Sequence, residues 1–310
     1  SDTIFSVMDT TLTIIADVVI LVTLPLHCRY LYIMMSKNSK ISSLEYAFRA
    51  TLTNIVVANL LYSIVFILVQ EPAAYGIFSF FYRVRFDNLS ESRWLGKLAI
   101  MQAVPLTLTT GIFHVIIAAN RMSAIISPIG HQKKSCQHKV GGACGPYLNF
   151  QLWSERRVSR IIFVIWTLTI LECLPLIYPF EGYYYDFRSP IGSIGVALGI
   201  SGDLPNLIYQ SIAMGVGGLL EIFVIFLYVF IGFRVSRLKN VVRSTVTTTI
   251  AAVLVSTGGF VIVLVYLPHV LSIRIRGKAI WSYEIFNALF KFAFAYNNAI
   301  APWVMLLYYR

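Results

Sequence analysis

Long apolar runs separated by short polar connections dominate the sequence. Seven runs are each about long enough for the roughly 20 helical residues that cross a hydrocarbon core of about 30 Å. They extend approximately over Thr11–Met35, Leu44–Gln70, Leu98–Ile126, Ile161–Phe180, Asn206–Phe233, Thr247–Ile273 and Ser282–Tyr309. Helices of soluble proteins average about a dozen residues, so consecutive runs of twice that length favour membrane spans. The pattern predicts an all-α membrane protein, a seven-transmembrane helix bundle, with a single domain over residues 1–310.

The composition supports lipid as the main surroundings of the chain. Hydrophobic residues make up 57% of the sequence and charged residues 13%, about half the charged share of a typical soluble domain. The net charge of +11 would suit nucleic acid, but the basic residues lie in short runs between apolar segments. In that position they interact with lipid headgroups and set topology. We therefore expect a lipid bilayer as partner and no nucleic acid.

Lysines and arginines in the connections predict the orientation. With the N-terminus outside, the inner connections and the C-terminus hold 15 of these residues and the outer connections hold 8, while Arg49 and Lys291 fall within apolar runs. This bias favours a multi-pass protein with an extracellular N-terminus. Asn88-Leu89-Ser90, a glycosylation acceptor pattern, then lies outside, although such tripeptides also occur by chance.

Three charged residues lie deep within the apolar runs: Glu172, Glu221 and Lys291. A charge near the bilayer centre costs about 2.5–3.5 kcal/mol on insertion scales, so each needs a partner, a cavity or a route to the interface. Lys291 is about two or three turns from the start of the seventh run. It has two interpretations, a residue that lines an interior cavity or a lysine that reaches the outer headgroups.

Several spacings resemble those of rhodopsin-like G-protein-coupled receptors. Asn54 and Asn59 stand where many of these receptors carry Asn and then Asp in the second span. The stretch Val265–Pro268, "VYLP", resembles their Cys-Trp-x-Pro hinge, with Tyr266 in place of the tryptophan. Trp166 and Pro175 match the spacing of the family's Trp and Pro, and "NN" stands where Asn-Pro is expected. The resemblance implies a polar core that packs the helices, formed by Asn54, Asn59, Trp166, Asn297 and Asn298.

Departures from that family point to a narrower group. Asn120-Arg121-Met122 replaces Asp/Glu-Arg-Tyr, Gly96 stands where the third span should begin with cysteine, and the loop from Glu181 to Leu204 has no cysteine. This combination resembles the nematode serpentine chemoreceptors of the gamma/V class superfamily. The resemblance is carried by "HVIIAANRMSAIISP", His114–Pro128, and by "LWSERRVSRIIFVIW", Leu152–Trp166.

The resemblance implies a plasma-membrane receptor that couples to a heterotrimeric G protein. Arg121 would face the cytoplasmic crevice, and the residues expected to contact the G protein are Asn120, Arg121, Arg234 and Arg237. The alternative for Arg121 is an interfacial arginine whose stem lies along apolar surface while its guanidinium reaches lipid phosphates.

A receptor of this kind binds a small molecule from outside. We expect its pocket among the outer halves of the third, sixth and seventh runs, lined by Gln102, Leu106, Thr107, Tyr266, Asn287 and Lys291. Pro268 removes a backbone hydrogen bond and supplies a hinge for the sixth helix. A ligand contact at Lys291 would favour acidic or carbonyl compounds.

Other functions find less support. No phosphate-binding glycine loop and no hydrolase or metalloprotease motif occurs, so we expect no enzyme and no cofactor. Cys136, His138 and Cys144 fit no common zinc spacing, so we expect no metal. "KFAFAYN", Lys291–Asn297, resembles the opsin lysine that binds retinal, but its counterion would have to be Glu172 or Glu181. A transporter or ligand-gated channel remains a further alternative, although no internal repeat is visible.

Overall fold

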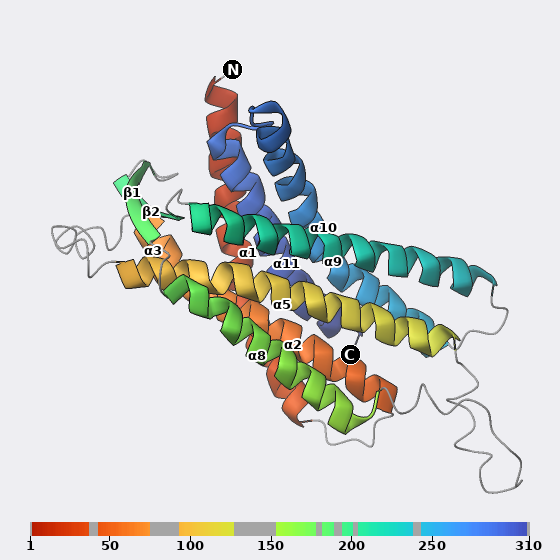
Figure 1. Cartoon of the computed structure of the whole chain (residues 1–310). Coiled ribbons are helices and arrows are strands. Elements are labelled where there is room, and N and C mark those ends of the chain that lie inside the picture. Colours follow the sequence, from red (N-terminus) through yellow and green to blue (C-terminus); the bar gives the residue numbers. More distant parts are fainter. Residues whose placement is uncertain are drawn as a thin grey trace, which may run out of the picture.

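Seven long helices account for most of the described chain (Figure 1). The computed structural model describes residues 2–36, 43–74, 93–126, 153–177, 182–188, 194–200, 204–237 and 243–308. The long helices are α1 (Asp2–Ser36), α2 (Ser43–Val65), α5 (Arg93–Ile126), α8 (Glu155–Ile177), α9 (Leu204–Arg237), α10 (Arg243–Arg276) and α11 (Tyr283–Tyr308). Each overlaps one predicted apolar run, so the helical prediction is confirmed, although several helices begin before their run. A π-helical turn, Phe66–Gln70, and the short α3 (Glu71–Ala74) continue α2.

Five of the described helices are long and apolar enough to cross a membrane. The qualifying segments are Thr10–Met35, Glu45–Val69, Pro105–Ile126, Gly215–Arg237 and Val246–Ile273. These segments indicate a multi-pass membrane protein. They do not include α8, which carries three arginines in its first six residues, or α11, which carries Lys291 and three asparagines.

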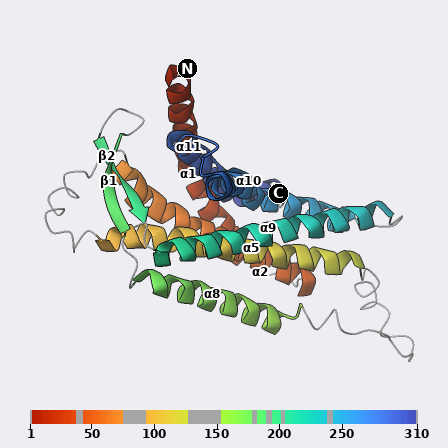
Figure 2. The same cartoon turned by 45° about the horizontal axis from the view of Figure 1, so that its top comes forward.

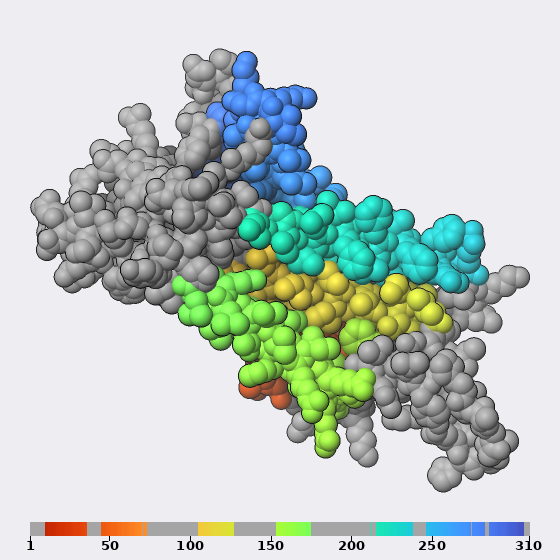
Figure 3. Space-filling model, viewed as in Figure 1, coloured from red at the N-terminus to blue at the C-terminus, as the bar shows by residue number. Residues whose placement is uncertain are grey.

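Large apolar side chains cover the outward faces of the helices. Phe163 on α8 is 72% exposed, and Leu219 and Phe226 on α9 are each 68% exposed. Figure 3 shows α8, α5 and α9 together on one face of the molecule. A water-soluble monomer rarely exposes contiguous apolar patches of such extent. The pattern suits helices that are surrounded by lipid chains.

The helices form two groups that cross at a steep angle. In Figures 1 and 2, α2, α5, α8 and α9 run side by side, whereas α1, α10 and α11 cross them. Helix α5 packs against α2, α8, α9 and α10, and α11 packs against both α1 and α10. Helix α5 is therefore the centre of the first group. The two groups are joined by contacts of α10 with α5 and α9 and by contacts of α2 with α1 and α11.

Buried apolar side chains form two core clusters along the bundle. One includes Tyr30, Phe48, Phe113 and Met305, each at most 2% exposed, and so joins α1, α2, α5 and α11. The other includes Tyr62, Leu106, Ile262 and Phe294, from α2, α5, α10 and α11.

A two-stranded antiparallel hairpin adds to the helices. Strand β1 (Gly182–Arg188) pairs with β2 (Ile194–Ile200), from Gly182 opposite Ile200 to Arg188 opposite Ile194. The hairpin packs against α5 and α3. The all-α prediction does not include it, because seven-residue strands rich in aromatic and β-branched residues are too short to stand out beside the long apolar runs.

Candidate functional site

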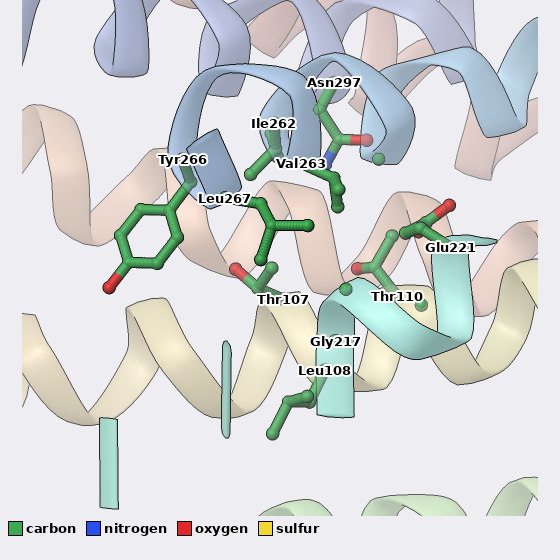
Figure 4. Close-up of a pocket in the computed structure, with 13 residues that line it drawn as sticks. Thr107, Leu108, Thr110, Gly217, Glu221, Ile262, Val263, Tyr266, Leu267 and Asn297 are labelled. Atoms are coloured by element: carbon green, nitrogen blue, oxygen red, sulfur yellow. The ribbon is translucent and has the colours of Figure 1, made fainter. Parts of the chain in front are cut away.

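A cavity lies between four helices, α5, α9, α10 and α11. Its empty volume is about 590 Å³, part of which is open to the surroundings. In Figure 4, Tyr266 lies at one end of this cavity and Glu221 at the other. The lining residues are Thr107, Leu108, Thr110, Gly111, Gly217, Gly218, Glu221, Gly259, Ile262, Val263, Tyr266, Leu267 and Asn297.

Glu221 is the charged residue of this lining, and it pairs with a buried histidine. Its Oε1 lies 2.8 Å from Nδ1 of His114 on α5. The side chain of His114 is 0% exposed and that of Glu221 is 7% exposed. Oε2 of Glu221 and Nε2 of His114 have no hydrogen-bond partner among the described residues. Burying a carboxylate oxygen without a hydrogen-bond partner is costly, and Oε2 can still accept a hydrogen bond that no described residue supplies.

Two adjacent glycines on α10 make room for this polar cluster. A Cβ on Gly259 would lie 2.0 Å from Oε1 of Glu221, and a Cβ on Gly258 would lie 2.8 Å from the Cα of Asn297. Any side chain at these positions would overlap the carboxylate of α9 or the backbone of α11. Gly258 and Gly259 therefore allow α9 and α11 to approach α10 on both sides.

Arg121 lies inside the bundle, at the far end of α5 from Thr107. Its exposed fraction is 4%. The guanidinium donates a hydrogen bond of 2.7 Å to Oγ1 of Thr248 on α10 and one of 3.1 Å to Oδ1 of Asn120. It also stacks over the ring of Phe48 on α2, with 4.3 Å between Cζ and the ring centroid. Arg121 thus connects α5 to both α2 and α10 and does not extend to the molecular surface.

Lys291 forms an ionic cluster with two carboxylates. Its Nζ lies 2.7 Å from Oδ1 of Asp17 on α1 and 2.9 Å from Oε1 of Glu71 on α3. The three side chains are between 13% and 17% exposed. Burial raises the pKa of the Glu71 carboxyl to about 7, while the nearby Lys291 ammonium acts to lower it and Asp17 to raise it. The cluster joins three helices away from the cavity.

The asparagines of the predicted polar core form hydrogen bonds between helices. Oδ1 of Asn54 accepts a bond of 2.7 Å from Nε1 of Trp166, which joins α2 to α8. Nδ2 of Asn59 donates to the backbone oxygen of Asn297 at 3.4 Å, which joins α2 to α11. Asn298 is 1% exposed and donates to the Phe294 backbone oxygen within its own helix. The structure thus brings together Asn54 with Trp166 and Asn59 with Asn297.

Two of the six predicted ligand-binding residues, Thr107 and Tyr266, line the cavity. Leu106 is buried in the second core cluster. Asn287 is half-buried on α11 without lining the cavity, and Lys291 is in the ionic cluster. Gln102 belongs to α5, but its side chain lies outside the described residues.

The six predicted ligand-binding residues do not include Glu221, the acid that lines the cavity. Asn297 also lines the cavity, but the sequence prediction assigned it to the polar core. The depth of Glu221 in its apolar run is the sequence signal that points to a cavity or a partner. Its helix is apolar on most sides, so the sequence does not indicate which neighbour it faces. His114, the histidine of the third run, is identified as its partner only by the packing of α5 against α9.

Arg234 and Arg237, two of the residues expected to contact a G protein, are exposed in the last turn of α9. Each stacks on a phenylalanine of its own helix, Phe230 or Phe233. Asn88 and the segment with Cys136, His138 and Cys144 lie outside the described residues. Within the described ranges, no group of three or more His, Cys, Asp or Glu residues could hold a metal ion.

No protein-family model matches this chain, and no curated protein matches it either. The features that bear on function are therefore the cavity, the polar contacts and the sequence motifs.

Proposed function

We propose that the protein is a G-protein-coupled chemosensory receptor of the plasma membrane. In this proposal all seven long helices cross the bilayer, the N-terminus is extracellular, and the cavity takes a small molecule. A heterotrimeric G protein binds at the cytoplasmic side near Arg121. The proposal includes the likeness to the nematode serpentine chemoreceptors that the motifs around Asn120 and Arg121 suggest.

The packing of α8 and α11 supports seven spans. Helix α8 exposes large apolar side chains along much of its length, including Ile161, Phe163 and Ile170. The polar residues of α11 lower its hydropathy, but Asn297 and Asn298 are buried against other helices and would not meet lipid. Tags at the two termini would test this topology, because seven spans place the termini on opposite faces of the membrane.

One observation carries the signalling proposal: the cavity and the contact between Arg121 and Thr248 involve the same two helices. Helices α5 and α10 supply Thr107 and Tyr266 to the cavity and Arg121 and Thr248 to the contact. A ligand that favours one arrangement of α10 against α5 therefore changes the stability of the Arg121–Thr248 hydrogen bond. That is how binding at one end of a helix pair shifts populations at the other.

The sequence of α10 supplies a means for that movement. Pro268 lies within the helix, two residues beyond Tyr266 of the cavity. Because proline removes one backbone hydrogen bond, the helix bends more readily there than elsewhere. In our proposal the arrangement described above is the resting one, in which Thr248 holds Arg121, and activation separates them.

The test is Thr248→Val, which keeps the side-chain shape and removes the hydrogen-bond acceptor. A hydrogen bond to a charged group contributes about 1.5–3 kcal/mol. Loss of about 1.5 kcal/mol from the resting arrangement should raise the active fraction about tenfold while that fraction is small. We expect a similar rise in basal nucleotide exchange on co-expressed G proteins, measured without ligand.

Thr167→Val is the matched control. Thr167 is exposed on α8, and its hydroxyl donates to the Phe163 backbone oxygen in the same helix. Its replacement should leave basal exchange at the wild-type level. Equal basal exchange for Thr248→Val and wild type, at equal surface expression, would contradict the proposed role of the contact.

A second candidate, an opsin-like retinal receptor, gains support from the ionic cluster. A protonated Schiff base on Lys291 needs a counterion, and Asp17 and Glu71 both lie within 3.0 Å of its Nζ. Purified protein mixed with retinal would then show a visible absorbance band that Lys291→Ala abolishes. This candidate ranks second because Lys291 does not line the cavity.

A further inference from the structure

The cavity contains hydrogen-bond acceptors for which the described part of the chain supplies no donor. Glu221 contributes an unpaired carboxylate oxygen, and the side-chain oxygen of Asn297 is also buried without a hydrogen-bond partner among the described residues. Both residues line the cavity. Unpaired buried acceptors are costly, and a ligand that donates hydrogen bonds removes that cost.

The charge of the lining has one sign. Glu221 is acidic, and the residues that line the cavity in the described part of the chain include no lysine or arginine. Lys291, the cation that the sequence suggested as a ligand contact, is held by Asp17 and Glu71 instead. The expectation of an acidic or carbonyl ligand therefore has no cation in this cavity to support it.

His114 is a close neighbour of the carboxylate. Its Nδ1 lies 2.8 Å from Oε1 of Glu221. Nε2 of His114 is buried and has no hydrogen-bond partner among the described residues. The contact with His114 engages Oε1 and orients the carboxylate, so Oε2 is the oxygen that a ligand would meet.

We propose that the cavity binds a small amine, whose ammonium group is held by Oε2 of Glu221 and by the carboxamide oxygen of Asn297. An ammonium group offers several N–H donors and one positive charge, which match these two acceptors and the carboxylate. This inference rests on the proposed function, because it assigns a ligand class to the proposed ligand cavity.

The rest of the lining indicates the shape of the amine. Glycines lie at the acidic end: Gly259 is in close contact with the carboxylate itself, whereas a Cβ on Gly218 would meet nothing within 4 Å. Toward Tyr266 the walls are apolar and come mainly from α10, as Figure 4 shows for Ile262 and Leu267. A primary amine with a short aliphatic or aromatic tail fits this arrangement, with its polar end at Glu221.

The test compares three probes that differ in their polar group and a fourth that differs in its tail. Isoamylamine, isoamyl alcohol and isovalerate share a branched five-carbon skeleton and carry a cationic, a neutral and an anionic head, and phenethylamine adds an aromatic tail. Each probe is titrated against the purified full-length protein in lipid nanodiscs, with binding measured by calorimetry. We expect at least one of the two amines to bind at least tenfold more tightly than the alcohol. Isovalerate should bind more weakly than both that amine and the alcohol.

Glu221→Gln is the decisive variant, because it keeps the size of the side chain and removes the charge. We expect it to weaken amine binding at least tenfold and to leave the affinity for the alcohol unchanged. Glu172→Gln, on α8 away from the cavity lining, is the control and should change neither affinity. If Glu221→Gln does not fold, the probe series on the wild-type protein still decides the ligand class.

The outcomes separate this inference from the proposed function. Equal or tighter binding of the alcohol or the acid, or no binding of either amine, overturns the amine assignment. If basal nucleotide exchange nevertheless rises in Thr248→Val, the receptor proposal stands without the amine assignment. Amine binding that Glu221→Gln removes, together with unchanged basal exchange in Thr248→Val, would support the amine site and contradict the signalling role of that contact.

Discussion

Replacing Lys291 with methionine tests the ionic cluster that joins α1, α3 and α11. Methionine keeps the length and apolar stem of the side chain and removes its charge. The ammonium lies 2.7 Å from Asp17 and 2.9 Å from Glu71, so its loss leaves two neighbouring carboxylates without their cation. Removing one partner of a buried ion pair costs about 3–5 kcal/mol.

The magnitude should fall at the lower end of that range. The three side chains are 13–17% exposed, so water partly screens the remaining carboxylates. A loss of about 3 kcal/mol corresponds to a fall in the thermal unfolding midpoint of about 5 °C for a chain of this size. The measurement is thermal unfolding of the protein in detergent, followed by tryptophan fluorescence at pH 8. Lys278→Met, at an exposed lysine between α10 and α11, should leave the midpoint unchanged.

The pH dependence gives this prediction its sharpest test. Burial raises the pKa of Glu71 from an ordinary value of 4.5 to about 7 in the folded protein. The folded state therefore binds the proton more tightly than the unfolded chain, so stability falls as pH rises from about 4.5 through about 7. Without Lys291 the pKa of Glu71 rises further, and the loss of stability between pH 6 and pH 8 should exceed that of wild type.

A second substitution should reverse part of the damage. Glu71→Gln in the Lys291→Met background removes one unpaired carboxylate, so we expect recovery of part of the lost midpoint and a weaker pH dependence. A Lys291→Met midpoint within about 2 °C of wild type at pH 8 would refute the argument that Lys291 neutralises a buried pair of acids.

Two further substitutions test the close contacts between helices. Gly258→Ala places a Cβ 2.8 Å from the Cα of Asn297, so it should separate α10 from α11 and cost about 1–3 kcal/mol by thermal unfolding. Gly232→Ala, where a Cβ meets nothing within 4 Å, should be neutral or slightly stabilising, and equal effects of the two would contradict the packing account. Trp166→Phe removes the 2.7 Å bond to Asn54 and should cost about 1 kcal/mol, measured in the same way; an unchanged midpoint would show that this bond adds nothing.

The sequence by itself determined where the helices lie along the chain. A run of about 20 apolar residues is a local property, and a helix is the form in which such a run satisfies its own backbone hydrogen bonds in lipid. The seven predicted runs therefore overlap α1, α2, α5, α8, α9, α10 and α11, one run to each helix. The hairpin of β1 and β2 escaped prediction because its pairing joins two short segments across an intervening loop.

Only the tertiary structure decided which polar groups meet. Glu221 and Lys291 stood out in the sequence because a charge within an apolar run needs a partner. Their partners, His114 for the first and Asp17 with Glu71 for the second, lie on other helices. The sequence of a helix that is apolar on most sides says little about how the helix is rotated or how deep it lies in the bundle. The faces that meet are therefore set by packing between helices.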